Sequence, residues 1–212
     1  MKILLHVCCS NCAIYPFKLL RSDKQNVTGL WFNPNIHPFE EYDLRLKSLK
    51  RLAGDWNIDM EFIEDYRPEE YFRLFGLNEP DTILSGDDNN VDRALKSVPP
   101  FPERCSSCYA LRLEKTADEA QKSGFHAFST TLLISPYQDF ELISNTGKAL
   151  SEKYNIEFYL QDFRPYFRDA MNSAKEMGLY RQKYCGCIFS MRERLTKKGS
   201  KGQRHKGTEK RS

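Results

Sequence analysis

The stretch Ile3-Leu4-Leu5-His6-Val7, followed at once by Cys8-Cys9-Ser10-Asn11-Cys12, decides the fold. The short, mostly apolar run predicts a buried strand. In open α/β proteins, ligand sites lie just beyond the carboxyl ends of such strands. Three thiols at that place therefore indicate chemistry more than packing.

The rest of the chain alternates predicted strands and helices. Further strands are expected over residues 27–32, 60–63, 127–133 and 156–160, and helices over 13–20, 38–53, 69–75, 105–122, 138–151 and 165–177. This alternation predicts an α/β fold: a Rossmann-like parallel sheet of about five strands, helices on both faces, and the cysteines at the carboxyl edge. The acidic, proline-containing stretch 77–104 is expected to be a long loop or lid, with one helical turn near residues 91–96.

The size and charge of the chain limit the class of protein to which it can belong. The 212 residues, 40% of them hydrophobic, predict one globular domain over residues 1–191. Residues 192–212 hold nine Lys and Arg and two Glu, which gives this tail a net charge of +7. Because the whole chain has a net charge of +3, residues 1–191 carry −4. A basic, flexible tail on a mildly acidic body suggests a polyanionic partner, although a merely solvated end is as good a reading.

No apolar run reaches the length of a membrane span, and the apolar start is too short for a signal peptide. We therefore expect a cytoplasmic protein without a membrane partner. Thiols stay reduced in that compartment, so grouped cysteines indicate metal or redox chemistry. The seven cysteines form three tight groups: Cys8, Cys9 and Cys12; Cys105 and Cys108; Cys185 and Cys187.

The first two groups have the spacing of metal ligands. Cys9 and Cys12 are three residues apart, as are Cys105 and Cys108, and a helix start favours their thiolate forms. A zinc ribbon keeps its two pairs about 15–20 residues apart. The much longer gap here favours an iron–sulfur cluster held by thiols from two strand ends.

The third group, Cys185-Gly186-Cys187, has a different spacing. A turn at Gly186 would bring the two sulfurs close, and strained bridges are easily reduced. A redox dithiol is the preferred interpretation. Ligands to a second metal, or two packed thiols, remain alternatives.

Polar and aromatic residues that follow the strands are expected to line a pocket. The sequence has no P-loop and no GxGxxG motif, which disfavours an ordinary ATP- or NAD-dependent enzyme. Tyr137 and Phe163 are positioned to stack on a base, and Arg164 to pair with a phosphate or an acid. Asn and Pro also form turns for purely local reasons.

An ordered set of motifs now points to a family. It consists of Cys8-Cys9-x-x-Cys12, Phe32-Asn33-Pro34-Asn35-Ile36-His37-Pro38, Glu41-Tyr42-x-x-Arg45, Cys105-x-x-Cys108-Tyr109-x-x-Arg112, Ser129-x-Thr131-Leu132 with Ser135-Pro136-Tyr137, Asp162-Phe163-Arg164-Pro165, and Gln182-x-Tyr184-Cys185-Gly186-Cys187. Together these resemble the QueH-type epoxyqueuosine reductases, from the first strand to about residue 190. Asn11, where many relatives have Pro, and a longer 77–104 segment and tail are departures.

The resemblance implies a cobalamin-independent iron–sulfur enzyme that reduces epoxyqueuosine in the anticodon loop of tRNA to queuosine at the wobble position. It assigns a 4Fe-4S cluster to Cys8, Cys9, Cys105 and Cys108. It assigns a redox-active disulfide to Cys185 and Cys187.

Several roles remain open beside that assignment. Cys12, Cys185 and Cys187 are an alternative set of ligands for a second iron, acting as a Lewis acid. Asp162 and Tyr137 are candidate proton donors, and an external electron donor is expected. The predicted substrate-binding residues are Asn33, Asn35, Tyr137 and Arg164.

Other function classes fit parts of the sequence. A metal-free thiol-disulfide oxidoreductase would be colourless after anaerobic purification. A zinc-stabilised RNA-binding module would hold zinc and show no turnover. A tRNA-thiolating enzyme of related fold is disfavoured because the nucleotide loop is missing.

Overall fold

The first strand is the centre of a parallel five-stranded sheet in the computed structural model, which describes residues 1–204 and the side chains of residues 1–196. The strands are β1 (Lys2–His6), β2 (Asn26–Trp31), β3 (Met60–Phe62), β4 (Ala127–Thr130) and β5 (Glu157–Phe158), in the order β3-β2-β1-β4-β5. All four pairings are parallel. The predicted fold class is confirmed.

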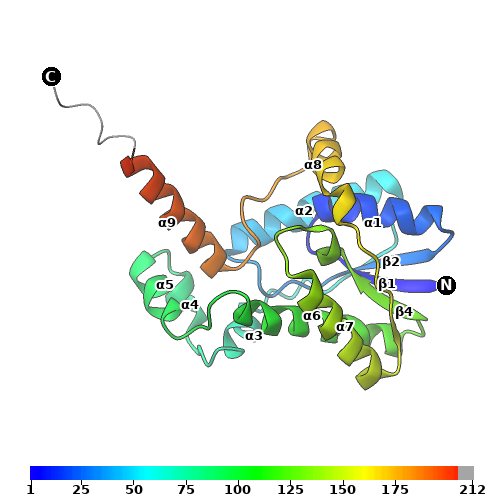
Figure 1. Ribbon diagram of the computed structural model, residues 1–212, viewed down its shortest axis with the longest axis horizontal. Coiled ribbons are helices and arrows are strands. Elements are labelled where there is room, and N and C mark those ends of the chain that lie inside the picture. Colours follow the sequence, from blue (N-terminus) through cyan, green and yellow to red (C-terminus); the bar gives the residue numbers. More distant parts are fainter. Residues whose placement is uncertain (205–212) are drawn as a thin grey trace.

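Helices cover both faces of this sheet (Figure 1). On one side lie α1 (Ser10–Ser22), α2 (Phe39–Trp56) and α8 (Phe167–Glu176), and on the other α6 (Glu103–Lys122) and α7 (Phe140–Tyr154). Their apolar stripes and the fully buried strand residues Ile3, Leu4 and Leu5 form the main hydrophobic core. The strand order reverses direction between β1 and β4, where α/β folds bind their ligands.

The 77–104 segment is more regular than expected. After α3 (Pro68–Arg73) it folds into α4 (Pro80–Leu84) and α5 (Asp88–Leu95), so the helical turn predicted near residues 91–96 belongs to a longer helix. Asp87 begins α5 by accepting a hydrogen bond from the Asn89 amide at 2.9 Å, and that cap explains where the helix starts.

A second, smaller core joins this segment to the last helix. Val91 and Ala94 of α5 pack in it with Phe72 and Phe189, the latter from α9 (Ile188–Arg204). The predicted boundary at residues 191/192 therefore falls inside a helix, and residues 192–204 are helical. Tail residues 205–212 lie outside the described part of the chain, and flexibility of the tail stays a prediction.

One strand ends earlier than predicted. β4 stops at Thr130, and residues Thr131–Ile134 form a short 3₁₀ helix, η1. The Thr130 hydroxyl accepts a hydrogen bond from the Leu132 amide at 3.1 Å, which caps this turn. A second 3₁₀ turn, η2 (Arg164–Tyr166), precedes α8. No helix in the described residues is long and apolar enough to span a membrane.

Candidate functional site

The three thiols that follow β1 converge at the carboxyl edge of the sheet. The sulfurs of Cys8, Cys9 and Cys12 all lie within 4.8 Å of one another. Cys9 is the N-cap of α1, and its sulfur accepts a hydrogen bond from the Cys12 amide at 3.4 Å. The helix start therefore sets the three-residue spacing and supplies an N–H group to the sulfur.

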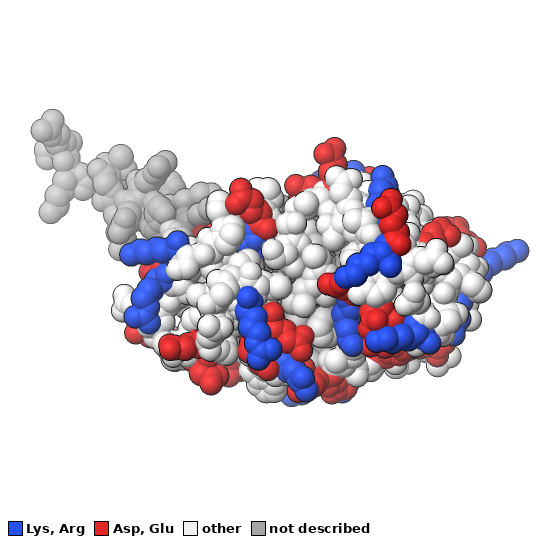
Figure 2. Space-filling model, turned by 90° about the horizontal axis from the view of Figure 1, so that it is seen from below, with Lys and Arg blue, Asp and Glu red and all other residues white. Residues whose placement is uncertain are grey.

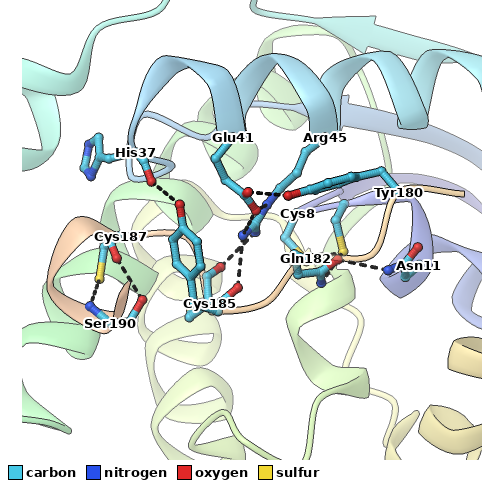
Figure 3. Close-up of polar contacts among 12 residues, drawn as sticks. Cys8, Asn11, His37, Glu41, Arg45, Tyr180, Gln182, Cys185, Cys187 and Ser190 are labelled. Atoms are coloured by element: carbon cyan, nitrogen blue, oxygen red, sulfur yellow. Dashed lines mark hydrogen bonds and ion pairs between the residues drawn. The ribbon is translucent and has the colours of Figure 1, made fainter. Parts of the chain in front are cut away.

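Further donors are directed at these sulfurs (Figure 3). The Gln182 amide nitrogen donates to Cys9 Sγ at 3.0 Å, and its oxygen accepts from Asn11 Nδ2 at 2.9 Å. The hydroxyl of Thr131, the first residue of η1, donates to Cys8 Sγ at 3.4 Å. Hydrogen bonds from Cys12 and Cys9 hold the pKa of the Cys8 thiol well below its usual range. The hydrogen bond with Cys12 acts to lower the pKa of Cys9, but the bond with Cys8 and burial outweigh it and raise that pKa to about 12. Hydrogen bonds with Cys8 and Cys9 raise the pKa of Cys12, so Cys8 is the thiol whose thiolate, the form in which cysteine binds metals, is favoured.

Cys105 and Cys108 begin α6 and face the third cysteine group. Burial, then the neighbouring Cys108, Cys185 and Cys187, raise the pKa of Cys105 to about 12. Cys108 and Cys187 are buried together in the second core. Cys105 and Cys108 are not part of the close group formed by Cys8, Cys9 and Cys12.

A buried arginine links the thiol groups. Arg112, in α6, donates to the Cys108 carbonyl at 3.0 Å and to Cys108 Sγ at 3.2 Å. Burial acts to lower the pKa of Arg112, but the charges of Cys108, Cys185 and Cys8 outweigh it and raise that pKa. One guanidinium therefore neighbours thiols from all three groups.

The Cys185-Gly186-Cys187 loop is held by the start of α2 (Figure 3). Arg45 is buried, binds Glu41, and donates to the carbonyls of Cys185 at 2.9 Å and Tyr184 at 3.0 Å. The Tyr180 hydroxyl donates to the other oxygen of Glu41 at 2.5 Å. This network fixes the loop backbone and leaves Cys185 exposed.

His37 makes the second set of contacts with the same loop. Its amide donates to the Gly186 carbonyl at 2.9 Å, and its carbonyl accepts from the Tyr184 hydroxyl at 2.5 Å. Its ring nitrogens lie 3.0 Å from the Pro34 carbonyl and 3.4 Å from the Ile188 amide. Burial lowers the pKa of His37 to about 3, so the ring is neutral and serves as a structural hub.

The two thiols of this loop have different surroundings. Cys185 Sγ lies 3.5 Å from Gln138 Nε2, whereas Cys187 is buried and its sulfur accepts from the Ser190 amide at 3.4 Å. Both are free thiols.

A cavity of about 1110 Å³ opens above the thiols. Cys8, Cys12 and Cys185 line it together, so sulfurs distant in sequence share one space. Tyr137, a predicted substrate-binding residue, also lines it and is 76% exposed.

The other predicted substrate residues lie outside this lining. Asn33 is buried and donates to the Val7 carbonyl at 2.9 Å, which is a structural role. Asn35 is buried with its side-chain oxygen unpartnered. Phe163 is fully buried and has no free face to stack on a base.

Asp162 and Arg164 pair with each other on the surface, at 2.7 Å. The hydrogen bond from Arg164 lowers the pKa of the Asp162 carboxyl. An ionised carboxylate accepts protons, so this environment does not support Asp162 as the proton donor. Nor is the Arg164 guanidinium free for a phosphate.

Gln182, Thr131, Arg112 and Arg45 were not among the site residues predicted from the sequence, although Thr131 stands in a stretch expected to line a pocket. The sequence placed Arg45 on a solvated helix face, and this was wrong because Arg45 is buried. All four stand within the quoted motifs, and Gln182 and Arg112 are each separated from a cysteine by only two or three residues. That proximity was the available signal. Their partners Cys9, Cys8 and Cys185 are set by the tertiary fold.

Comparison with known proteins agrees with this geometry. The family model described as "Epoxyqueuosine reductase QueH" matches residues 3–83 and 87–193. The chain is 33% identical over 199 residues to an epoxyqueuosine reductase QueH of Dehalococcoides mccartyi, covering 94% of this chain and 97% of the relative. It is 32% identical over 197 residues to the QueH of Thermotoga maritima, covering 92% and 93%.

A solved structure shares the fold. It is the U34-tRNA thiolase NcsA from Methanococcus maripaludis with its [4Fe-4S] cluster, with a TM-score of 0.53 and 12% identity over 97% of this chain and 67% of that one. At this identity the likeness concerns the fold alone.

Proposed function

The chain belongs to the QueH family of epoxyqueuosine reductases, and from this premise we propose that it reduces epoxyqueuosine in tRNA to queuosine. It is an enzyme and an oxidoreductase. The observation that carries the proposal is the group of three thiols, Cys8, Cys9 and Cys12, at the cavity above the sheet edge. A reduction needs an electron carrier beside its substrate, and grouped thiolates are the protein ligands of iron–sulfur clusters.

The residues present fit such a group. Three sulfurs converge, and the amide of Gln182 and the hydroxyl of Thr131 donate to them. A bound 4Fe-4S cluster would supply single-electron transfer. We propose that Cys8 and Cys9 hold it, with Cys105 and Cys108 as the remaining ligands implied by the family resemblance. Cys12 is the competing ligand, because its sulfur is in the close group.

The reaction removes the epoxide oxygen as water, takes up two electrons and two protons, and leaves an alkene. Oxidation of two thiols to a disulfide releases two electrons and two protons, so Cys185 and Cys187 would balance one turnover. An external electron donor would then reduce the disulfide. Exposure of Cys185 in the cavity supports its role as the thiol nearer the substrate.

The cavity residues would bind and orient the nucleoside. Gln138 lies beside Cys185, and Tyr137 stands exposed at the cavity, where its hydroxyl would be the proton donor that Asp162 is poorly suited to be. A cytoplasmic location remains a prediction. Two alternatives remain, a metal-free oxidoreductase and a zinc-stabilised RNA-binding module. Bound iron would distinguish the proposed enzyme from both.

The test uses the full chain purified without oxygen. We expect iron, sulfide and broad visible absorbance, and conversion of epoxyqueuosine to queuosine in tRNA, measured by mass spectrometry of the digested nucleosides. Protein with zinc alone, or without metal, would contradict the cluster. Unchanged epoxyqueuosine in the presence of a reductant that reduces the cluster would contradict the activity.

Single substitutions assign the ligands. We expect Cys8→Ser, Cys9→Ser, Cys105→Ser and Cys108→Ser each to lose most iron per chain, and Cys12→Ser to keep it. If Cys12→Ser loses its iron while Cys105→Ser and Cys108→Ser keep theirs, the cluster ligands are instead the close group of Cys8, Cys9 and Cys12. The Cys187→Ser variant, with its sulfur in the second core, is expected to keep iron and lose turnover.

A further inference from the structure

The segment Arg181–Cys185 lines the cavity, and its side chains alternate between exposed and half-buried. Gln182 is anchored inward by its bonds to Asn11 and Cys9. Its neighbours Arg181 and Lys183 are exposed and line the cavity. Because the inward residue is fixed on both its polar atoms, the two flanking cations are held at the opening.

A third cation joins them from another element. Arg194, on α9, is exposed and lines the same cavity. The remaining charged residues of the lining are neutralised, Arg45 by Glu41 and Glu193 by Arg104 at 2.7 Å. Within the described residues, the side chains of Arg181, Lys183 and Arg194 have no ion-pair or hydrogen-bond partner. The opening therefore carries three uncompensated positive charges.

The face of the molecule seen from below in Figure 2 carries charges of both signs. Figure 2 shows acidic and basic side chains side by side on the face formed by the helices below the sheet. Ion pairs of α6 include Lys115–Glu119 and Lys122–Asp118. Such paired charges produce little field at a distance, whereas unpaired cations around one opening attract an anion.

An exposed aromatic ring stands at the same opening. Tyr137 is 76% exposed, and its ring lies at 84° to the ring of Phe167, with the two centroids 5.7 Å apart. Phe167 also lines the cavity. Most of the Tyr137 ring is therefore open to solvent, and exposed aromatic rings are the surfaces on which unpaired bases stack.

The size of the cavity limits what enters. At about 1110 Å³ it slightly exceeds the range of roughly 300–1,000 Å³ typical of small-molecule pockets. One modified nucleoside fits in such a volume, but an RNA loop does not. The phosphates on either side of an inserted nucleoside must then remain at the opening.

We propose that Arg181, Lys183 and Arg194 bind phosphates of the anticodon loop, and that Tyr137 stacks on a base next to the nucleoside in the cavity. This assignment rests on the proposed function and specifies how the RNA partner is held. It departs from the sequence-based expectation for Arg164, which is paired with Asp162, whereas Arg194 belongs to the predicted basic tail of residues 192–212.

The first test is the salt dependence of binding. The affinity of the anaerobic full-length protein for tRNA carrying epoxyqueuosine is measured over a range of KCl. In the triple variant Arg181→Gln, Lys183→Gln, Arg194→Gln, the slope of log K against log salt should fall by about 2, since each contact with single-stranded RNA contributes about 0.7. At 0.1 M salt the affinity should fall roughly 10- to 100-fold.

The control removes the same number of exposed, unpaired cations away from the cavity, with Lys24→Gln, Arg73→Gln and Lys148→Gln. We expect the slope of log K against log salt in this control to differ from the wild-type slope by less than about 0.7, the contribution of one phosphate contact. An unchanged slope in the triple variant, or an equal fall in the control, overturns the phosphate assignment. All substituted side chains are exposed, and equal thermal midpoints verify folding.

The second test separates stacking from proton donation. Tyr137→Phe should bind tRNA as the wild type does, and Tyr137→Ala should bind about tenfold more weakly. Equal affinity of Tyr137→Ala and wild type overturns the stacking assignment. If Tyr137→Phe binds tRNA normally but loses turnover, the Tyr137 hydroxyl is catalytic. The stacking role of the ring is unaffected by that result.

Failure of this inference and failure of the proposed function give different results. If the function is wrong, the wild type leaves epoxyqueuosine unchanged. If only the phosphate assignment is wrong, the wild type converts epoxyqueuosine and the triple variant binds tRNA with the wild-type slope.

Discussion

Arg112 is a buried cation that neighbours thiols of all three cysteine groups. Its guanidinium is buried, and no carboxylate pairs with it in the part of the chain that the structure describes. A buried charge without a counter-charge is costly, by several kcal/mol. The neighbouring sulfurs of Cys108, Cys185 and Cys8 are the groups able to compensate it. The site is therefore built to hold negative charge.

This predicts an effect on redox behaviour. Arg112→Gln removes the cation and should make the reduction potential of the iron-loaded protein more negative by about 60 mV or more, since 59 mV is tenfold in a one-electron equilibrium. Arg112→Lys keeps the charge and should shift the potential less. Potentiometric titration followed by visible absorbance measures both. An unchanged potential in Arg112→Gln would contradict charge compensation.

At the scale of elements, the loop after α8 depends on the start of α2. Three successive carbonyls, of Tyr184, Cys185 and Gly186, accept hydrogen bonds from Arg45 or the His37 amide. Gly186 has φ of +146°, and a Cβ there would lie 3.2 Å from Ile36 and 3.4 Å from Arg45. Only glycine allows this close approach without strain.

Gly186→Ala is therefore expected to lower the free energy of unfolding by about 2 kcal/mol, through backbone strain and displaced neighbours. The matched control is Gly54→Ala in α2, where an added Cβ meets no atom within 4 Å. It should stabilise the protein by up to about 1 kcal/mol, because alanine is the better helix former. Urea unfolding of the anaerobic protein measures both. A neutral Gly186→Ala would show that the loop has room to adjust.

At the scale of the whole molecule there are two hydrophobic cores. The sheet and its covering helices share the larger one, while α3, α4, α5 and the start of α9 share the smaller. Arg192 of α9 reinforces the smaller core by binding Asp92 at 2.7 Å and also Asp88. Because Cys108 and Cys187 lie in it, its stability bears directly on the thiol groups.

Phe189→Ala and Phe128→Ala compare the two cores, since each removes a fully buried ring. Each should cost about 3–5 kcal/mol. Hydrogen exchange followed by mass spectrometry should show faster exchange of α5 and the start of α9 in Phe189→Ala, with β1 and β4 still protected. Phe128→Ala should raise exchange in the sheet. A uniform rise in Phe189→Ala would mean that the two cores unfold as one unit.

Much of this molecule could be predicted from local pattern. The run Ile3–Val7 gave the central strand, and the strand–helix alternation gave the parallel sheet, because period and length of apolar runs are local properties. Within the 77–104 segment only one helical turn was predicted, and α9 was not predicted as a helix. Their apolar residues, such as Val91 and Phe189, are sparse and become buried only against each other.

The sequence by itself determined the elements, the three cysteine groups and the resemblance that named a reductase family. The tertiary structure alone decided which thiols meet, that Gln182 reaches Cys9, that Arg112 neighbours Cys8 and Cys185, and that, among the described residues, three cations at the cavity stay unpaired. The physical reason is that hydrogen bonding and charge pairing depend on distances in space. Those distances are set by strand order and helix packing across more than a hundred residues of separation, as in Gln182 and Cys9.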